Sequence, residues 1–496
     1  MAAPQTLPHD VEPVPPVDLQ NNKSKTKSAA KHAPHKEKNP SPQAIKTLTA
    51  LFTKGRYTEA ATFAQTMTAR FPLYRFGWMI LGLAFKQIGR GAEALEPMQK
   101  AAALSPTDAD AHNNLGIILM GMGRLDEAET SYRRALEIKP DFAVAHNNLG
   151  LTLKDLGRLD EAAASFRRAL EIKPDYADAH YNLGNILCDL GDIAQAIAVY
   201  QKILTIDPQN FGMEAAVSLA TLYYLDGSIE RCRNMLEVSR PINAASGSAH
   251  EYARTYWGYL NSLLADYQEH NGEKHQRKDL DALYVVGDSH SLSAHGVVVR
   301  YHGQEMNCTA KWLEGCKQWH LGNSKPNRFK HRFEGIMKTL PHESMILLLI
   351  GEIDCRPDEG IIKAWKKSQG TSLEEVAKAT AASYVSYVTG IAAKFGHRVI
   401  VGGIPATNIR LDTLDTETAG QLVRLIRLFN TVLKDQALAA SMDFLDVYAL
   451  TDRGDGIASG EWHIDNNHLL PSAITEAFSK HLVASEHPGS PAKHGK

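Results

Sequence analysis

The sequence predicts two structural classes in one chain: an all-α solenoid of helical repeats, followed by an α/β three-layer sandwich with a parallel sheet. Glycine and proline recur every 34 residues through the first half, as in stacked helical repeats. Beyond residue 281, short apolar segments alternate with long amphipathic ones, which is typical of parallel strands joined by helices. At 496 residues the chain is also too long for one ordinary hydrophobic core.

The composition of the chain argues against several classes of function. A net charge of -2 gives no general attraction to nucleic acid or anionic membrane, and no apolar run is long enough to span a membrane. Five scattered cysteines without a paired framework indicate reduced thiols, and the start lacks a secretory pattern. We therefore expect a cytoplasmic protein. The sequence has no phosphate-binding glycine loop, and His320, His331 and His342 are too widely spread for a metal site, so we expect neither cofactor nor metal.

Residues 1–42 form a basic leader. Five prolines punctuate its first part and six lysines follow, opposed by the single acid Glu37. Such a segment cannot bury enough apolar surface to offset its ordering entropy, so we expect it to be disordered. We expect the same of the tail at residues 486–496. A basic arm for an acidic partner is the alternative, and nothing in the leader separates the two.

The helical array is predicted over residues 43–268. Its glycines and prolines stand at fixed steps of 34: Gly55, Gly89, Gly123, Gly157 and Gly191, with Pro72, Pro106, Pro140, Pro174 and Pro208. Glycine ends the first helix of each unit, and proline marks the turn between units. Small residues such as Gly116 and Ala128 let the two helices approach closely. This pattern closely resembles the tetratricopeptide repeat (TPR), with a further imperfect unit to about residue 238 and a closing helix over 243–268.

One residue type suggests what the array binds. Asn114, Asn148 and Asn182 lie 34 residues apart, and stacking would place them in a row on the concave side. The row is similar to the asparagine ladder of O-GlcNAc transferases, which implies a protein or extended peptide as partner, because an amide both donates to and accepts from a peptide backbone. Alternatively, these asparagines only support the fold.

Residues 269–281 are polar and non-periodic, and are predicted to be a linker. In the domain that follows, at 282–485, strands are predicted at 283–286, 345–350, 398–402 and 443–447. Helices are predicted at 373–395, 416–440 and 472–482. Three short polar motifs follow or precede these elements: Gly287-Asp288-Ser289, a segment from Gly351 to Arg356, and Asp465-Asn466-Asn467-His468. In a parallel sheet such motifs converge on one edge.

The order of these motifs resembles the SGNH hydrolases (GDSL-like esterases) over residues 281 to about 485. The resemblance implies a flavodoxin-like sheet, Ser289 as nucleophile, His468 as general base and Asp465 as the acid that orients the imidazole. It also implies an oxyanion site formed by the Ser289 N–H and a glycine, for which Gly322 is the candidate.

The third motif departs from the family pattern. Gly351 and Asp354 fit, but Ile353 stands where the family has an asparagine that donates to the oxyanion. Arg356 or Asn323 could substitute for that donor.

These features predict a serine esterase, acyl hydrolase or acyltransferase acting on a small acylated substrate, acylated carbohydrate included. A non-catalytic interaction protein with the α/β domain as a platform is the alternative. Glycosyl transfer is a third class, suggested only by the repeats. Among neighbouring residues, His463 is an alternative base, His290 a rim residue and Cys355 a buried thiol.

Overall fold

The computed structural model describes residues 39–245, 251–270, 279–351, 355, 360–367, 370–408, 414–465 and 468–485. Almost all of the basic leader and the whole C-terminal tail lie outside these residues, as does most of the linker. The described chain falls into two compact units that divide between Leu183 and Gly184. Each unit is described by itself below.

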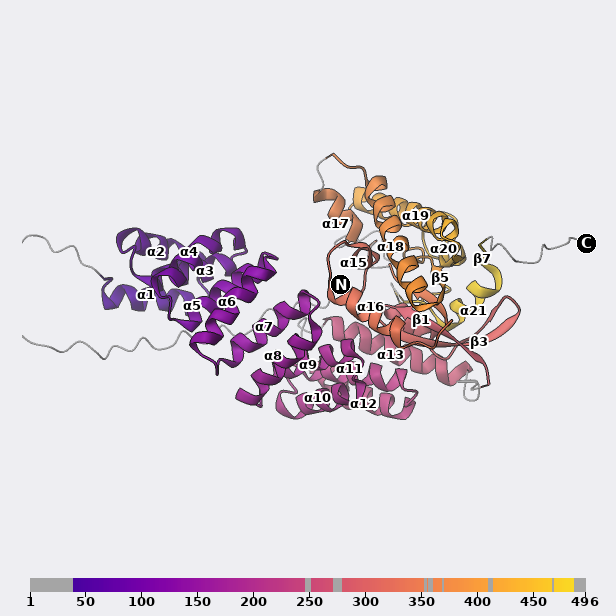
Figure 1. Cartoon of the computed structure of the whole chain (residues 1–496), viewed down its shortest axis with the longest axis horizontal. Helices are drawn as coiled ribbons and strands as arrows, with labels where there is room; N and C mark the ends of the chain where they lie inside the picture. Colours follow the sequence, from indigo (N-terminus) through magenta and orange to yellow (C-terminus); the bar gives the residue numbers. More distant parts are fainter. Residues whose placement is uncertain are drawn as a thin grey trace, which may run out of the picture. The chain divides into compact units, whose positions relative to one another are not determined.

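Residues 42–245 form the expected array of antiparallel helix pairs (Figure 1). The pairs are α1 Pro42–Thr53 with α2 Tyr57–Arg70, α3 Arg75–Gln87 with α4 Gly91–Leu104, α5 Ala109–Gly121 with α6 Leu125–Ile138, α7 Ala143–Asp155 with α8 Leu159–Ile172, α9 Ala177–Leu190 with α10 Ile193–Ile206, and α11 Gly212–Leu225 with α12 Ile229–Ala245. Helix α13, Glu251–His270, closes the array. The division between the two compact units falls inside α9.

The glycines act as the repeat pattern predicted. Gly123 follows α5 with a φ of 73°, a left-handed conformation that other residues adopt only with strain. Inside the same helix, a Cβ on Gly116 would lie 2.6 Å from the ring of Tyr132 on α6. Glycine is therefore required at this position because the ring of the paired helix occupies the space that a side chain would need.

The second domain is built on a seven-stranded mixed sheet, in the order β2-β3-β1-β4-β5-β6-β7. Its strands are β1 Asp281–Gly287, β2 Val298–Tyr301, β3 Gln304–Trp312, β4 Met345–Leu349, β5 Arg398–Gly402, β6 Asp443–Leu445 and β7 Leu482–Val483. The five central strands run parallel, in the order β3-β1-β4-β5-β6.

Both edges of the sheet depart from the all-parallel prediction. At one edge β2 pairs antiparallel with β3, and at the other β7 pairs antiparallel with β6. Strands β2, β3 and β7 were not predicted from the sequence. The reason is local: β3 alternates polar and apolar residues and is only half-buried, so it lacks the continuous apolar run of a central parallel strand.

Alternating side chains along the strands pack into two cores, one on each face of the sheet. In β4, Ile346 and Leu348 join one core, whereas Leu347 and Leu349 join the other. The first core is covered by α16 Arg328–Thr339, α17 Gly360–Lys367, α18 Leu373–Phe395 and α19 Thr416–Ala439. The second is covered by α14 Ser289–Ala294 and α21 Pro471–Lys480. The remaining short helices are α15 Gln318–Gly322 and α20 Val447–Thr451.

The last helices of the array belong to the same compact unit as the sheet. Asp189, on the last turns of α9, accepts a hydrogen bond from Nη1 of Arg332 on α16 at 2.5 Å, and both side chains are largely buried. On α11, the Tyr224 hydroxyl donates to the carbonyl of Leu292 on α14 at 3.4 Å. The array and the α/β domain therefore meet through polar contacts as well as apolar ones. Within the described residues, no helix combines the length and apolar character needed to cross a membrane.

Candidate active site

The candidate nucleophile lies where β1 ends. A Cβ on Gly287 would lie 2.2 Å from the Leu349 carbonyl of the neighbouring strand, so this strand end admits only glycine. Asp288 then caps α14, and its Oδ1 accepts the His290 backbone N–H at 3.1 Å. Ser289 is the first residue of α14, and only 6% of it is exposed. The backbone N–H groups of the next two residues, His290 and Ser291, both donate to Asp288, so the Ser289 N–H is the candidate donor to an anion at this helix start.

The candidate base and its acid form a close pair. His468 Nδ1 lies 2.6 Å from Asp465 Oδ2, and the His468 backbone N–H donates to Asp465 Oδ1 at 2.8 Å. The carboxylate thus holds the ring proton on Nδ1 and leaves Nε2 as an acceptor. Only 3% of His468 is exposed. Burial lowers the pKa of His468, and the Asp465 carboxylate opposes this shift, so the imidazole is neutral at physiological pH.

A tyrosine that was not singled out from the sequence contacts both the candidate nucleophile and the candidate base. The ring of Tyr259, on α13, stacks on the His468 ring with centroids 3.9 Å apart and planes 14° apart. Its hydroxyl donates to the Ser289 carbonyl at 2.9 Å. Ser289 and His468 therefore lie against the same side chain. Tyr256, one turn earlier, meets the edge of the His468 ring and packs on Trp312 at the end of β3.

Two more histidines gather at this site. His290 lies with its ring centroid 6.0 Å from that of His468, and its Nδ1 is 3.0 Å from Asp288 Oδ1. Burial, together with the charge of His290, lowers the pKa of His463 to about 4. Because His463 stays neutral and lacks an acid partner like Asp465, it does not match the geometry of the His468 pair.

Some buried polar atoms of this site have no hydrogen-bond partner within the described part of the chain. They are Asp288 Oδ2, His463 Nδ1 and Trp312 Nε1. Asp288 Oδ2 can accept a hydrogen bond, Trp312 Nε1 can donate one, and His463 Nδ1 can do either, depending on its tautomer. A polar ligand would find complementary groups at this edge of the sheet. Among the described residues, no cluster of histidine, cysteine and acidic side chains could hold a metal ion.

The third motif is described only in part. Gly351 has a φ of 134°, and a Cβ there would lie 2.6 Å from Nε2 of Gln318. Gln318 is fully buried, and its Nε2 donates to the Ile350 carbonyl at 2.7 Å. This amide, which holds the end of β4, was not predicted from the sequence. Glu352, Ile353, Asp354 and Arg356 lie outside the described residues, whereas Cys355 is described and buried, as expected.

The other oxyanion candidates are held by local contacts. A Cβ on Gly322 would lie 3.0 Å from Ser383 and Tyr384 of α18, so the absence of a side chain lets α15 pack closely on α18. Asn323 Oδ1 accepts the Lys325 backbone N–H at 2.9 Å. Both contacts give these residues a structural role of their own.

The asparagine row belongs to the array. Asn148 Nδ2 donates to Asn113 Oδ1 of the preceding pair at 3.0 Å, and Asn182 Nδ2 donates to Asn147 Oδ1 at the same distance. Asn148 and Asn182 are buried, whereas Asn114 is half-buried. Two of the three amides thus join neighbouring helices, and peptide capture by the row stays a prediction.

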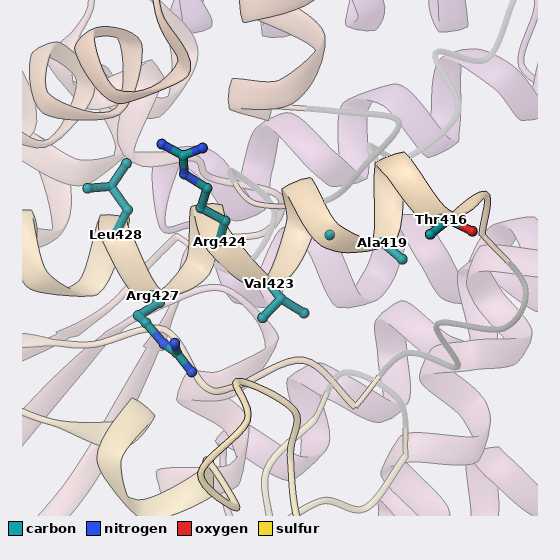
Figure 2. Close-up of a pocket in the computed structure, with 7 residues that line it drawn as sticks. Thr416, Ala419, Val423, Arg424, Arg427 and Leu428 are labelled. Carbon is teal, nitrogen blue, oxygen red and sulfur yellow. The ribbon is translucent and has the colours of Figure 1, made fainter.

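A surface hollow of about 610 Å³ lies along α19, apart from these residues (Figure 2). Its lining consists of Thr416, Ala419, Gly420, Val423, Arg424, Arg427 and Leu428. All seven come from one helix, and none is a candidate catalytic residue. The hollow is therefore an open groove on the surface of α19.

Comparison with protein families identifies the array. One tetratricopeptide-repeat family model matches residues 46–109 and 147–211, and a second matches residues 107–175. The array is a TPR solenoid. Tetratricopeptide repeats bind peptides or proteins, so protein interaction is the function that these repeats support.

Solved structures include three similar proteins: MamA, YrrB, which is described as a TPR protein with an unusual peptide-binding site, and PilF of Pseudomonas aeruginosa. They are 24%, 22% and 22% identical to this chain, with TM-scores of 0.31, 0.31 and 0.32. The matches cover 32%, 35% and 40% of this chain and 94%, 90% and 93% of those proteins. No curated protein matches the chain.

Proposed function

We propose that this protein is a TPR-scaffolded serine esterase or O-acyltransferase of the SGNH type. The observation that carries the proposal is the buried His468–Asp465 pair, with 2.6 Å between Nδ1 and Oδ2, joined to Ser289 through Tyr259. Further support comes from the parallel strand order β3-β1-β4-β5-β6, which matches the flavodoxin-like order expected of that family.

In this mechanism, Nε2 of His468 removes the Ser289 hydroxyl proton while Oγ attacks the acyl carbonyl of an ester. The tetrahedral intermediate collapses to a seryl ester, and the leaving alcohol takes the proton from the imidazolium. Water or an acceptor hydroxyl then attacks the seryl ester, with His468 again accepting a proton, so that the serine is restored. Asp465 remains ionised and stabilises the imidazolium throughout.

The oxyanion would be stabilised first by the backbone N–H of Ser289, at the start of α14. Further donors come from the region of Gly322 and Asn323 and from Arg356. Since Ile353 cannot donate, the buried amide of Gln318 beside Gly351 is an additional candidate for organising this region. The proposed substrate is a small acylated molecule, acylated carbohydrate included. The proposed partner is a protein or extended peptide on the concave TPR face, with the half-buried Asn114 as its most accessible amide.

A fluorophosphonate probe tests this proposal, because it reacts covalently with a serine that a base has activated. We expect the full-length protein to label at Ser289, and we expect Ser289→Ala and His468→Ala to abolish labelling. Ser291→Ala is the matched control, since Ser291 lies two residues away on α14 and its hydroxyl is hydrogen-bonded to backbone carbonyls. Absence of labelling in the wild type, or equal labelling of Ser289→Ala, would refute the catalytic proposal.

One observation favours a second candidate, a binding platform without catalysis. Ser289 and His468 are both almost fully buried, and Tyr259 covers one face of the imidazole. A catalytic site must admit substrate, whereas a platform need not. A protein that binds acylated sugars in calorimetry yet never labels with the probe would be such a platform.

A further inference from the structure

The closing helix of the TPR array contributes directly to the candidate active site. Tyr259 lies on α13, is 99% buried and belongs to the same compact unit as the sheet. Its ring covers one face of the His468 imidazole with the centroids 3.9 Å apart. α13 is the helix that ends the array, and Figure 1 shows it beside the elements of the α/β domain.

The Tyr259 hydroxyl is the centre of a buried hydrogen-bond network. It donates to the Ser289 carbonyl at 2.9 Å and lies 2.6 Å from the Ser293 hydroxyl. Ser293 has a single hydroxyl proton, which it donates either to the Tyr259 oxygen or to the Leu469 carbonyl, 2.6 Å away and one residue after His468. The Ser289 and Ser293 positions of α14 therefore both contact one phenol. Burial raises the pKa of Tyr259 well above its ordinary value, so the phenol stays protonated and remains a donor.

We propose that Tyr259 is a positioning residue of the active site, supplied by the array: its ring supports the imidazolium form of His468, and its hydroxyl holds the backbone of Ser289. This inference rests on the proposed function, because it assigns Tyr259 to the same reaction. An aromatic face within about 6 Å of a cation attracts it, and the attraction grows when water is excluded. The attraction between the Tyr259 ring and His468 is therefore strongest when His468 is an imidazolium, which is the form it takes after removing the Ser289 proton.

Other groups around His468 also affect the charge of its imidazole. Asp465, on its own loop, and Asp288, at the cap of α14, both favour the imidazolium, whereas burial and His290 disfavour it. His463 lies close enough for His468 to lower its pKa. On α13 the facing groups are the tyrosines Tyr256 and Tyr259. Tyr259 is the one aromatic group of these that stacks face to face, so its removal has a direct effect on the imidazolium.

The test compares Tyr259→Leu, which removes the ring, with Tyr259→Phe, which removes only the hydroxyl. Tyr200→Leu and Tyr200→Phe are matched controls, because Tyr200 is a buried tyrosine of the same unit whose hydroxyl donates to Asn185 rather than to the site. Two quantities are measured in the full-length protein. One is the pKa of His468, from NMR of ¹³C-labelled histidine assigned with His468→Gln, and the other is the pH dependence of fluorophosphonate labelling.

For Tyr259→Leu we expect the pKa of His468, and the acid limb of labelling, to fall by roughly one pH unit. For Tyr259→Phe we expect an unchanged pKa and labelling that is slower by about tenfold, because Ser289 loses the donor that holds its backbone. The Tyr200 variants should change neither quantity. If Tyr259→Leu does not fold, Tyr259→Met, which has a similar volume, replaces it.

The outcomes separate the two proposals. A wild-type protein that never labels, but whose His468 pKa falls in Tyr259→Leu, refutes the catalytic function and leaves the support of the imidazolium intact. A wild-type protein that labels, with the same pKa and labelling rate in Tyr259→Leu and Tyr259→Phe, overturns the role assigned to Tyr259.

Discussion

Replacing Asp465 with asparagine tests the geometry of the proposed triad most directly. The two carboxylate oxygens of Asp465 have different partners: Oδ1 accepts the His468 backbone N–H, and Oδ2 accepts the Nδ1 proton of the ring. Asparagine has only one oxygen, so its amide nitrogen must face one of these two donors. If the nitrogen faces Nδ1, the ring proton moves to Nε2, and the base can no longer accept the Ser289 proton.

The expected magnitude follows from this change. Loss of the correct tautomer in a comparable triad costs about 10⁴ in rate, so we expect labelling of Asp465→Asn to fall by roughly 10³–10⁴. The Asp465 carboxylate also raises the pKa of His468 against the effect of burial. Its removal should therefore lower that pKa, and the acid limb of residual labelling should move to lower pH by roughly 1–2 pH units.

The assay is the second-order rate of fluorophosphonate labelling, measured between pH 4 and pH 9 with full-length protein. Asp455→Asn is the control, since Asp455 is an exposed acid that pairs with Arg453. Circular dichroism checks that both variants are folded. If Asp465→Asn labels as fast as the wild type, or if its acid limb moves to higher pH, the triad assignment is wrong.

Three further predictions concern stability. Gly116→Ala should destabilise the array by about 1–3 kcal/mol, because the new methyl group meets the facing Tyr132 ring. The control Gly121→Ala, in the same helix, has open space and should be neutral or stabilising. Equal urea midpoints of the two variants would contradict this. Asp189→Ala should lower the free energy of unfolding by roughly 3 kcal/mol, because Arg332 stays buried without this carboxylate. Adding Arg332→Met should recover most of the lost stability. If the double variant stays as unstable as Asp189→Ala, the pairing is not the cause. Asp443 accepts four hydrogen bonds, and despite its burial they lower its pKa. The contribution of the Asp443 carboxylate to folding stability is present above its unfolded pKa of about 4 and is lost as pH falls through its lower folded pKa. Asp443→Asn should therefore unfold more easily at neutral pH and lose less stability on acidification than the wild type. Parallel stability curves of the two proteins from pH 7 to pH 2 would contradict this.

The sequence alone determined those features that depend on neighbouring residues. Helix pairs follow from a 34-residue period, because each turn and each close approach needs its glycine or proline within the same repeat. The strand Arg398–Gly402 and the helix Leu373–Phe395 have the predicted bounds, since a continuous apolar run and a capped amphipathic run are local signals. The pairing of His468 with Asp465 is likewise local, at a separation of three residues.

Edge strands and long-range contacts needed the tertiary structure. The pairing of β2 with β3 depends on which strand lies at the edge, and half-buried alternating residues do not encode that position. Gln318 showed no signal because a single amide in a short helix has no pattern, and its contact with Gly351 joins segments more than 30 residues apart.

Tyr259 illustrates the same limit at the site itself. In the sequence it is one of several aromatic residues at helical spacing in a closing helix, a pattern that ordinary core packing explains equally well. Only the docking of α13 against α14 places its ring on His468 and its hydroxyl on the Ser289 carbonyl. The sequence motifs and their resemblance to the SGNH hydrolases pointed to the candidate triad residues, whereas packing between the array and the sheet places Tyr259 against two of them, because that contact depends on residues distant along the chain.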